Sequence, residues 1–170
     1  MVAFKVASNE DIRALGRKLL HLLEDHESQV YQENIVKFGI PDDYVKKVFA
    51  EDTLIEAAKS GKAVFYLVLR KREIVGFAQT LQHDPTTAEL DRIIIFPEQT
   101  RKGIGTLLLR HAAEDQKRRG IETMVVNAGK EESHARRFYE KNGFQKEKET
   151  TIQTPWGGKI DLVTYKLDIR

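Results

Sequence analysis

Residues 90–109, "LDRIIIFPEQTRKGIGTLLL", contain the pattern that decides the fold. A run of strand-forming residues ends at Pro97, and two glycines one residue apart then precede an apolar helical pattern. Gly103 and Gly105 allow a tight turn and a close approach of the backbone to a ligand. The helix that follows has unpaired N–H groups and a partial positive charge at its start, to which Arg101 and Lys102 add. The stretch therefore predicts a phosphate-binding turn between a strand and a helix.

Other glycine motifs fit this loop poorly. A P-loop requires G-x-x-x-x-G-K-S/T, and no such sequence occurs in the chain. A dinucleotide-binding fingerprint requires a third glycine, where Leu108 stands here. Taken alone, the loop leaves an ordinary strand-to-helix turn open as the alternative.

A second motif, "ARRFYEKNGF" at residues 135–144, follows about thirty residues later. The pair of motifs resembles the central signature of the GNAT superfamily of acyl-CoA-dependent N-acyltransferases. That signature runs through a strand, an R-x-x-G-x-G/A loop, a helix, a strand and A-x-x-F-Y-E-K-x-G-F. The resemblance covers roughly residues 89–144. It implies a mixed α/β fold whose curved, mostly antiparallel sheet has splayed central strands and helices on both faces.

The order of expected elements agrees with this fold, and we expect a single domain over residues 1–170. Helices are predicted from Ser8 or Asn9 to about Asp25, from Pro41 onward, over 104–119 and over 133–142. Residues 29–40 fit either a loop or a short helix, and residues 53–60 either continue the second helix or form a separate turn. Strands are predicted at 2–7, 63–70, 74–81, 89–96, 124–127, 144–151 and 160–167.

The resemblance implies how acetyl-CoA is held as the cosubstrate. Main-chain groups of Ile94, Ile95 and Phe96 would pair with the pantetheine arm as an extra strand does. The amides expected to hold the diphosphate are those of Arg101, Lys102, Gly103, Ile104, Gly105 and Thr106. Many members have asparagine where Glu132 stands, so Asn127 or Ser133 would replace that contact. Arg136 would meet the adenosine phosphate, or only water.

Acetyl transfer to an amine leaves a thiolate that needs a proton or a strong hydrogen bond. The resemblance places Tyr139 beside the sulfur of coenzyme A as the general acid. A phenol, with a pKa of about 10, facing a thiol near 8.5 makes full proton transfer uphill by about 2 kcal/mol, but the phenol can stabilise developing charge. The alternative is a core tyrosine on the apolar face of a helix.

The same reaction needs a base, because an alkylamine with a pKa of about 10.4 is almost entirely ammonium at pH 7. Glu89 and Asp91 are two residues apart, so a regular strand would place both on one face. In some GNAT members a strand carboxylate here acts as the base, often through water. The alternative is a pair of solvated charges near the start of a strand.

Acidic residues also gather at the end of the first helix. Glu24, Asp25 and Glu27 lie where the family places part of its acceptor site, and carboxylates there would attract a cationic amine. Negative charge at a helix C-terminus is unfavourable with the macrodipole. The alternative is a solvated polar turn.

Composition narrows the classes of function. The chain has no cysteine, so disulfides, thiolate metal sites and cysteine nucleophiles are excluded. None of its five histidines forms an H-x-x-x-H pair, so we expect no metal. The 28 basic and 26 acidic side chains nearly cancel, which argues against nucleic acid as a partner. No signal peptide or membrane-length apolar run is visible, and we expect a cytoplasmic protein.

These observations predict an N-acetyltransferase that transfers the acetyl group of acetyl-CoA to a primary amine by direct attack in a ternary complex. A small-molecule acceptor such as a polyamine is the first interpretation. Acetylation of protein lysines or N-termini, and a non-catalytic module that senses acyl-CoA, are the alternatives. Trp156, in a Pro-Trp-Gly-Gly turn, fits a plain turn, a substrate wall or the contact of a homodimer.

Overall fold

A computed structural model of the chain describes residues 1–97 and 103–170. None of the helices within these residues is both long and apolar enough to cross a membrane. The strands are β1 (Ala3–Val6), β2 (Ala63–Arg70), β3 (Glu73–Asp84), β4 (Thr87–Ile95), β5 (Thr123–Gly129), β6 (Gln145–Gln153) and β7 (Lys159–Asp168). The helices are α1 (Asn9–Glu24), α2 (Gln29–Asn34), the 3₁₀ turn η1 (Val36–Phe38), α3 (Asp42–Val48), α4 (Glu51–Lys59), α5 (Ile104–Arg118) and α6 (Ser133–Lys141).

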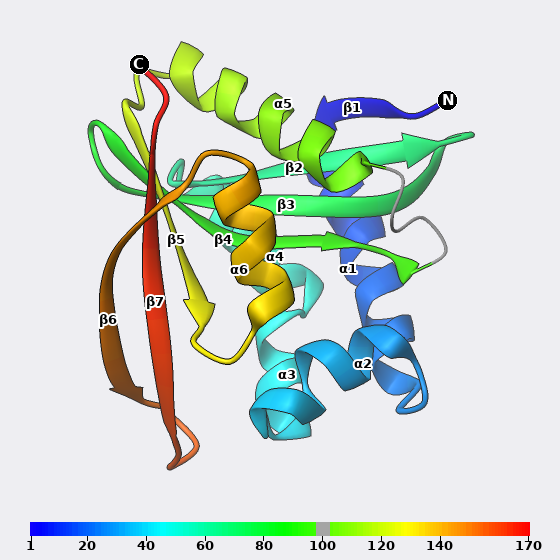
Figure 1. The fold of residues 1–170 in the computed structure, drawn as a ribbon. Coiled ribbons are helices and arrows are strands. Elements are labelled where there is room, and N and C mark those ends of the chain that lie inside the picture. The colour runs from blue at the N-terminus through cyan, green and yellow to red at the C-terminus, as the bar shows by residue number, and fades with distance from the viewer. Residues whose placement is uncertain (98–102) are drawn as a thin grey trace.

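The seven strands form one sheet in the order β1-β2-β3-β4-β5-β7-β6. Every neighbouring pair is antiparallel except β4 and β5, which are parallel. The β4–β5 pairing extends only from Thr87–Thr123 to Glu89–Val125, although β4 continues to Ile95. The two strands then diverge, as Figure 1 shows. The predicted fold, with splayed central strands, is confirmed.

Helices cover both faces of the sheet (Figure 1). Helices α5 and α6 pack on one face, and α1 to α4 pack on the other. We call the first apolar cluster the α5–α6 core; its buried members include Tyr66, Leu90, Leu108, Ala112, Met124, Tyr139 and Tyr165. We call the second the N-terminal core; its buried members include Ile12, Leu15, Leu19, Phe49, Phe65, Leu67, Phe77 and Phe96.

The N-terminal helices follow local signals in the sequence. Ser8 caps α1 with a capping box, in which its hydroxyl accepts the Asp11 N–H and the Asp11 carboxylate accepts the Ser8 N–H. Residues 29–38, which the sequence left open, form α2 and η1. Helix α3 ends at Val48 and α4 begins at Glu51, so residues 53–60 belong to a separate helix.

A β-bulge interrupts β4 at Asp91. Leu90 and Arg92 pair with consecutive residues of β3, which leaves Asp91 as the extra residue. Leu90 and Ile93 therefore both pack against the α5–α6 core, which regular alternation along a strand would not allow. Bulges occur frequently beside active sites, where they re-aim side chains.

A second bulge interrupts β3 near its end. Gln82 and Asp84 face consecutive residues of β4, and His83 between them is the extra residue. The two bulges lie on either side of Glu89 in the β3–β4 ladder, so the chain departs from regular pairing around that carboxylate.

A polar network attaches α5 to the sheet. The Tyr66 hydroxyl donates to the Asp115 carboxylate at 2.6 Å, and Gln116 Nε2 donates to Tyr66 at 2.8 Å and to Thr80 at 3.0 Å. Burial, followed by the bond to Asp115, raises the pKa of Tyr66. These bonds hold the C-terminal end of α5 to β2 and β3.

Gly76 of β3 allows β4 to lie close, and replacing it with alanine is expected to destabilise the fold. An added Cβ would lie 2.8 Å from Ile95 Cδ1, 2.9 Å from the Ile94 carbonyl oxygen and 2.9 Å from Val68 Cγ1. The carbonyl cannot move without shifting β4, so we expect Gly76→Ala to lower the free energy of unfolding by about 1–3 kcal/mol in urea titrations.

Gly16→Ala provides the matched control. Its Cβ would lie 3.0 Å from Glu51 Cγ and 3.3 Å from Glu51 Cα, so the clash is milder than at Gly76 and calls for a shift of a few tenths of an ångström in α4. Alanine also favours the helix over glycine by roughly 1 kcal/mol. Equal urea midpoints for Gly76→Ala and Gly16→Ala would contradict the packing argument at Gly76.

Candidate active site

The turn before α5 has the geometry that the glycine motif predicts. Gly103 has φ of 72° and ψ of 7°, in the left-handed region that favours glycine, and is the N-cap of α5. The Leu107 N–H donates to the Gly103 carbonyl at 3.2 Å. The amides of Ile104, Gly105 and Thr106 precede this bond, at positions that have no acceptor within an α-helix. Arg101 and Lys102, predicted to join them, lie outside the described residues.

Gly105 brings the two sequence motifs together. A Cβ on Gly105 would lie 3.3 Å from the Phe138 ring of α6 and 3.8 Å from Ile95 of β4. A Cβ here would require the Phe138 ring to shift by a few tenths of an ångström, whereas its distance to Ile95 is an ordinary van der Waals contact. The close packing explains Gly105 independently of any ligand, and it places the helix start beside the open edge of β4.

The open edge of β4 exposes main-chain groups of Ile93 and Ile95. The Phe96 N–H donates to the Val75 carbonyl of β3 at 2.9 Å. Hydrogen-bonding directions alternate along an antiparallel pair, so Ile94 also points toward β3 while Ile93 and Ile95 point toward β5. This changes which main-chain groups can pair with pantetheine. The Phe96 N–H is already bonded within the sheet and Ile94 faces β3, so the candidates are Ile93 and Ile95. The register of β4 against β3 determines which residues face the gap, and the sequence alone does not give that register.

Tyr139 lies on α6 with its ring in the α5–α6 core and 9% of the residue exposed. Its ring meets Phe138, Phe144 and Tyr165 at centroid distances of 5.5, 5.7 and 6.3 Å. Its hydroxyl has no hydrogen-bond partner among residues 1–97 and 103–170. Burial, and then the Glu132 carboxylate, raises the pKa of Tyr139 to about 12, so the phenol stays protonated at neutral pH.

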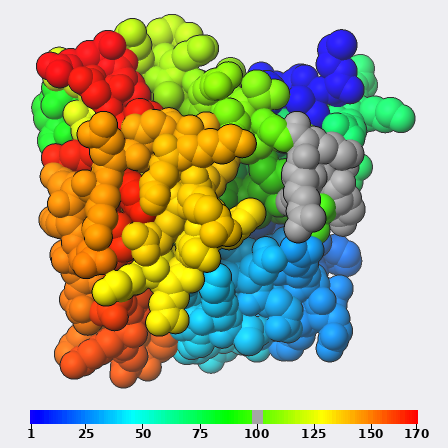
Figure 2. Space-filling view, viewed as in Figure 1, coloured from blue at the N-terminus to red at the C-terminus, as the bar shows by residue number. Residues whose placement is uncertain are grey.

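Glu132 closes the loop between β5 and α6. Its carboxylate accepts the Gly129 N–H at 3.2 Å and lies 3.7 Å from Lys37 Nζ of η1. Figure 2 shows the surface of this loop, in yellow, bordering the blue surface of the N-terminal helices. Glu132 therefore has a structural role here that the asparagine of many GNAT proteins would not share.

The other residues predicted to contact the cofactor lie around this loop. Asn127 Oδ1 accepts the Thr164 hydroxyl at 2.5 Å. Ser133 is exposed in the first turn of α6. Arg136 donates through Nε to the Tyr165 hydroxyl at 3.0 Å and through Nη1 to the Lys130 carbonyl at 2.9 Å. Two of the Arg136 donors therefore connect parts of the fold, and the roles of all three residues toward a ligand stay predictions.

Glu89 faces the N-terminal core. It pairs with Leu81 of β3, which packs against that core, and directly paired residues share a face of a sheet. Glu89 Oε1 lies 2.8 Å from His83 Nε2. Asp91 is the bulged residue, and its carboxylate lies 3.9 Å from Arg92 Nε. The bulge interrupts the regular alternation from which a shared face was predicted, so the grouping of Asp91 with Glu89 stays a prediction.

Arg92 lies beside the Asp91 carboxylate, and no sequence motif marks it. Its guanidinium stacks on the Phe49 ring, 4.4 Å from the centroid, and burial lowers its pKa. Tyr44 of α3 meets Trp156 of the β6–β7 turn edge-on at 5.1 Å. The turn around Trp156 thus reaches α3, and the two form a wall on the Glu89 face of the sheet.

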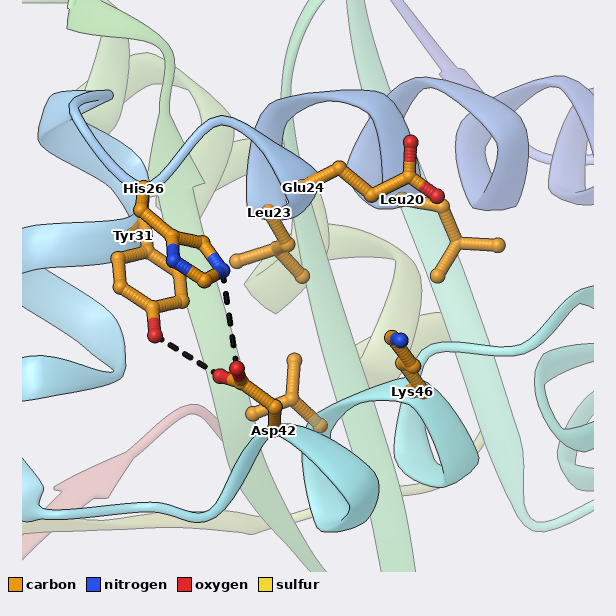
Figure 3. A pocket seen from close by; sticks show the side chains of 8 residues that line it. Leu20, Leu23, Glu24, His26, Tyr31, Asp42 and Lys46 are labelled. Carbon is orange, nitrogen blue, oxygen red and sulfur yellow. Dashed lines mark hydrogen bonds and ion pairs between the residues drawn. The ribbon is translucent and has the colours of Figure 1, made fainter.

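A pocket of about 220 Å³ lies between the end of α1, α2 and α3 (Figure 3). The His26 and Tyr31 rings stack at 4.3 Å, and both reach Asp42: Tyr31 donates to Oδ1 at 2.8 Å, and His26 Nε2 lies 3.6 Å from Oδ2. The hydrogen bond to Asp42 raises the pKa of Tyr31. Glu24 lines the pocket, with its carboxylate turned away from Asp42 in Figure 3.

The three carboxylates predicted to bind substrate therefore separate. Glu24 lines the pocket, whereas Asp25 ends α1 and accepts the Glu27 N–H within the following turn. Asp42 takes the central place in the pocket, although the sequence marked it only as part of a helix start. Its role depends on contacts between α2 and α3, which no local pattern reports.

Comparisons with known proteins agree with this arrangement. The profile of the acetyltransferase (GNAT) domain matches residues 61–146, just over half of the chain. A spermidine N(1)-acetyltransferase of Thermoplasma acidophilum is 28% identical over 118 residues, which are 69% of this chain and 72% of that protein.

Solved structures show the same fold. A PaiA N-acetyltransferase from Thermoplasma acidophilum, in complex with coenzyme A, superposes with a TM-score of 0.68 at 22% identity and covers 99% of both chains. The ribosomal-protein-S18-alanine N-acetyltransferase of Escherichia coli has a TM-score of 0.71 at 19% identity, over 99% of this chain and 94% of that one. With the profile match, the splayed strands and both motifs in place, this chain belongs to the GNAT acetyltransferase family and is an N-acetyltransferase.

Proposed function

We propose that the protein transfers the acetyl group of acetyl-CoA to the primary amine of a small molecule, directly and within a ternary complex. The observation that carries the proposal is the gap between β4 and β5 beyond Glu89. Tyr139 belongs to the face of α5 and α6, and Glu89 points toward the opposite face. A thioester held in the gap would be reached by an acid from one side and by an amine and a base from the other.

The donor would occupy the gap as an additional strand. Main-chain groups of Ile93 and Ile95 are available to pair with the amides of pantetheine, and the start of α5 lies beside them. Amides at the N-terminus of a helix bind phosphate groups well, so Gly103 to Thr106 would hold the diphosphate. Binding in this way fixes the thioester before the amine arrives, which provides much of the acceleration.

The chemistry would then need three proton transfers. The Glu89 carboxylate takes a proton from the ammonium, and the free amine attacks the carbonyl carbon of the thioester. The C–N bond forms, the tetrahedral intermediate loses one of its two N–H protons to solvent, and the C–S bond breaks. The Tyr139 hydroxyl donates to the departing sulfur as its charge develops. Asp91 is the alternative base, and its ion pair with Arg92 favours Glu89.

Acidic groups and one relative support a cationic acceptor such as a polyamine. Glu24 and Asp42 line the pocket between α1 and α3 together with Lys46, so carboxylates outnumber ammonium groups there and would attract an alkylammonium group. The relative from Thermoplasma acidophilum carries the name of a spermidine acetyltransferase. Acetylation of protein amines, and sensing of acyl-CoA without turnover, are the alternatives.

Release of free thiol from acetyl-CoA tests the proposal. We expect purified protein to release thiol when spermidine or a diamine is present, with formation of the acetylated amine verified by mass spectrometry. An N,N,N′,N′-tetramethylated diamine is the matched control, because both of its nitrogens are tertiary and cannot form a stable amide. Turnover with lysine peptides or protein N-termini but not with small amines would support the protein alternative, whereas tight binding of acetyl-CoA without turnover on either class would support a sensor.

A further inference from the structure

The contact between His83 and Glu89 connects the proposed base to a second titratable side chain. His83 Nε2 lies 2.8 Å from Glu89 Oε1, with 47% of the His83 side chain and 20% of the Glu89 side chain exposed. His83 is the extra residue of the β3 bulge, so it has no cross-strand partner of its own. Among residues 1–97 and 103–170, His83 is the one side chain that hydrogen-bonds to the Glu89 carboxylate.

We infer that His83 is a positioning residue for Glu89 that makes acetyl transfer depend on the protonation of its imidazole. The inference rests on the proposed function of Glu89 as the base. A neutral His83 donates its Nε2 hydrogen to Oε1 and fixes the carboxylate, while Oε2 stays available for the proton of the ammonium. The bulge at His83 serves this role, because it turns a strand residue toward the neighbouring carboxylate.

Protonation of His83 would oppose the reaction. An imidazolium 2.8 Å from Glu89 forms an ion pair with the carboxylate, and a nearby positive charge disfavours uptake of a further proton by Glu89. No proton passes through His83 in this scheme: the amine proton moves to Glu89 and then to solvent. The expected signature is loss of activity as the pH falls through the range in which imidazoles titrate.

Other titratable groups near His83 do not account for such a limb. Asp84 follows it in the chain, and the amides of Thr86 and Thr87 bind its carboxylate and lower its pKa. Carboxylates, lysines and arginines ordinarily titrate outside pH 5–8, where histidine titrates. Other titratable side chains at this end of the sheet include Lys62, Asp91, Arg92 and Glu122, with Tyr44 of α3 beside Arg92.

The ratio of kcat/KM between His83→Gln and wild type, measured from pH 5.5 to pH 8.5, tests the inference. Glutamine keeps an N–H donor but cannot become charged, and ionisation of the substrate cancels in the ratio. We expect the ratio to be about tenfold higher at pH 5.5 than at pH 8, because glutamine cannot gain the positive charge that an imidazole gains in acid. His83→Ala removes the donor, so its kcat at pH 8 should fall several-fold below that of His83→Gln. His21→Gln, the same change at an exposed histidine of α1, should give a flat ratio.

Three outcomes separate the possible failures. A flat ratio for His83→Gln, with a folded variant by circular dichroism, overturns the role of His83. Full activity of Glu89→Gln instead overturns the proposed base while acetyl transfer itself stands. If both roles are correct, His83 acts only through the Glu89 carboxylate. Adding His83→Gln to Glu89→Gln should then change kcat/KM by less than twofold at every pH measured.

Discussion

Replacing Tyr139 with phenylalanine should lower kcat by roughly 10²–10³-fold, within the range that a positioned acid contributes. Phenylalanine keeps the ring contacts with Phe138, Phe144 and Tyr165, and the hydroxyl has no partner to lose among the described residues. The affinity for coenzyme A, measured by calorimetry, should therefore change by less than about twofold because the fold is kept. Since the pKa of Tyr139 is raised to about 12, the wild-type rate should show no loss from its ionisation up to pH 10.

Tyr165→Phe is the matched control for this experiment. It removes a hydroxyl from a buried ring 6.3 Å away that accepts a hydrogen bond from Arg136. We expect a loss of about 1 kcal/mol in the free energy of unfolding, with kcat changed by less than about threefold. If Tyr139→Phe retained the wild-type kcat, the tyrosine would be a core residue only.

Replacing Glu89 with glutamine should lower kcat/KM at pH 7 by about 100-fold, since the variant cannot take the ammonium proton. Glutamine has nearly the same shape and still offers an oxygen to His83 Nε2, so the local structure is kept. The loss should shrink as the pH rises toward 10, because free amine then becomes abundant for a substrate with a pKa of about 10.4. Initial rates of thiol release between pH 7 and pH 10 measure this change.

Asp91→Asn decides between the two carboxylates of β4. The Asp91 carboxylate lies on the bulge and 3.9 Å from Arg92 Nε. We therefore expect Asp91→Asn to lower kcat/KM by less than about fivefold. A larger, pH-dependent loss for Asp91→Asn than for Glu89→Gln would transfer the role of base to Asp91.

The central part of the fold could be predicted from sequence because its signals are local. Gly103 and Gly105 mark the turn before α5, and apolar periodicity fixes the helix to within a residue of its predicted end. Gly143, with φ of 92°, follows the end of α6, where glycine commonly terminates a helix. These features depend on residues a few positions apart, and each signal agrees with the fold that the pair of motifs implies.

The site residues outside the motifs depend on partners that lie far along the chain. Whether Ile95 or Phe96 presents a free N–H depends on the register of β4 against β3. The bulges at His83 and Asp91 likewise exist only relative to the neighbouring strand. Asp42 becomes the centre of a pocket because Tyr31 and His26 fold toward it, across a segment that sequence patterns left open.

The brief pairing of β4 with β5 has a consequence for how this enzyme can be improved. Extending that pairing beyond Glu89 would add hydrogen bonds and make the protein harder to unfold, yet it would fill the space that we propose for the thioester. Substitutions that raise the free energy of unfolding must therefore be made elsewhere in the molecule. The main-chain groups of β4 beyond Glu89 can hydrogen-bond either to β5 or to the substrate, but not to both.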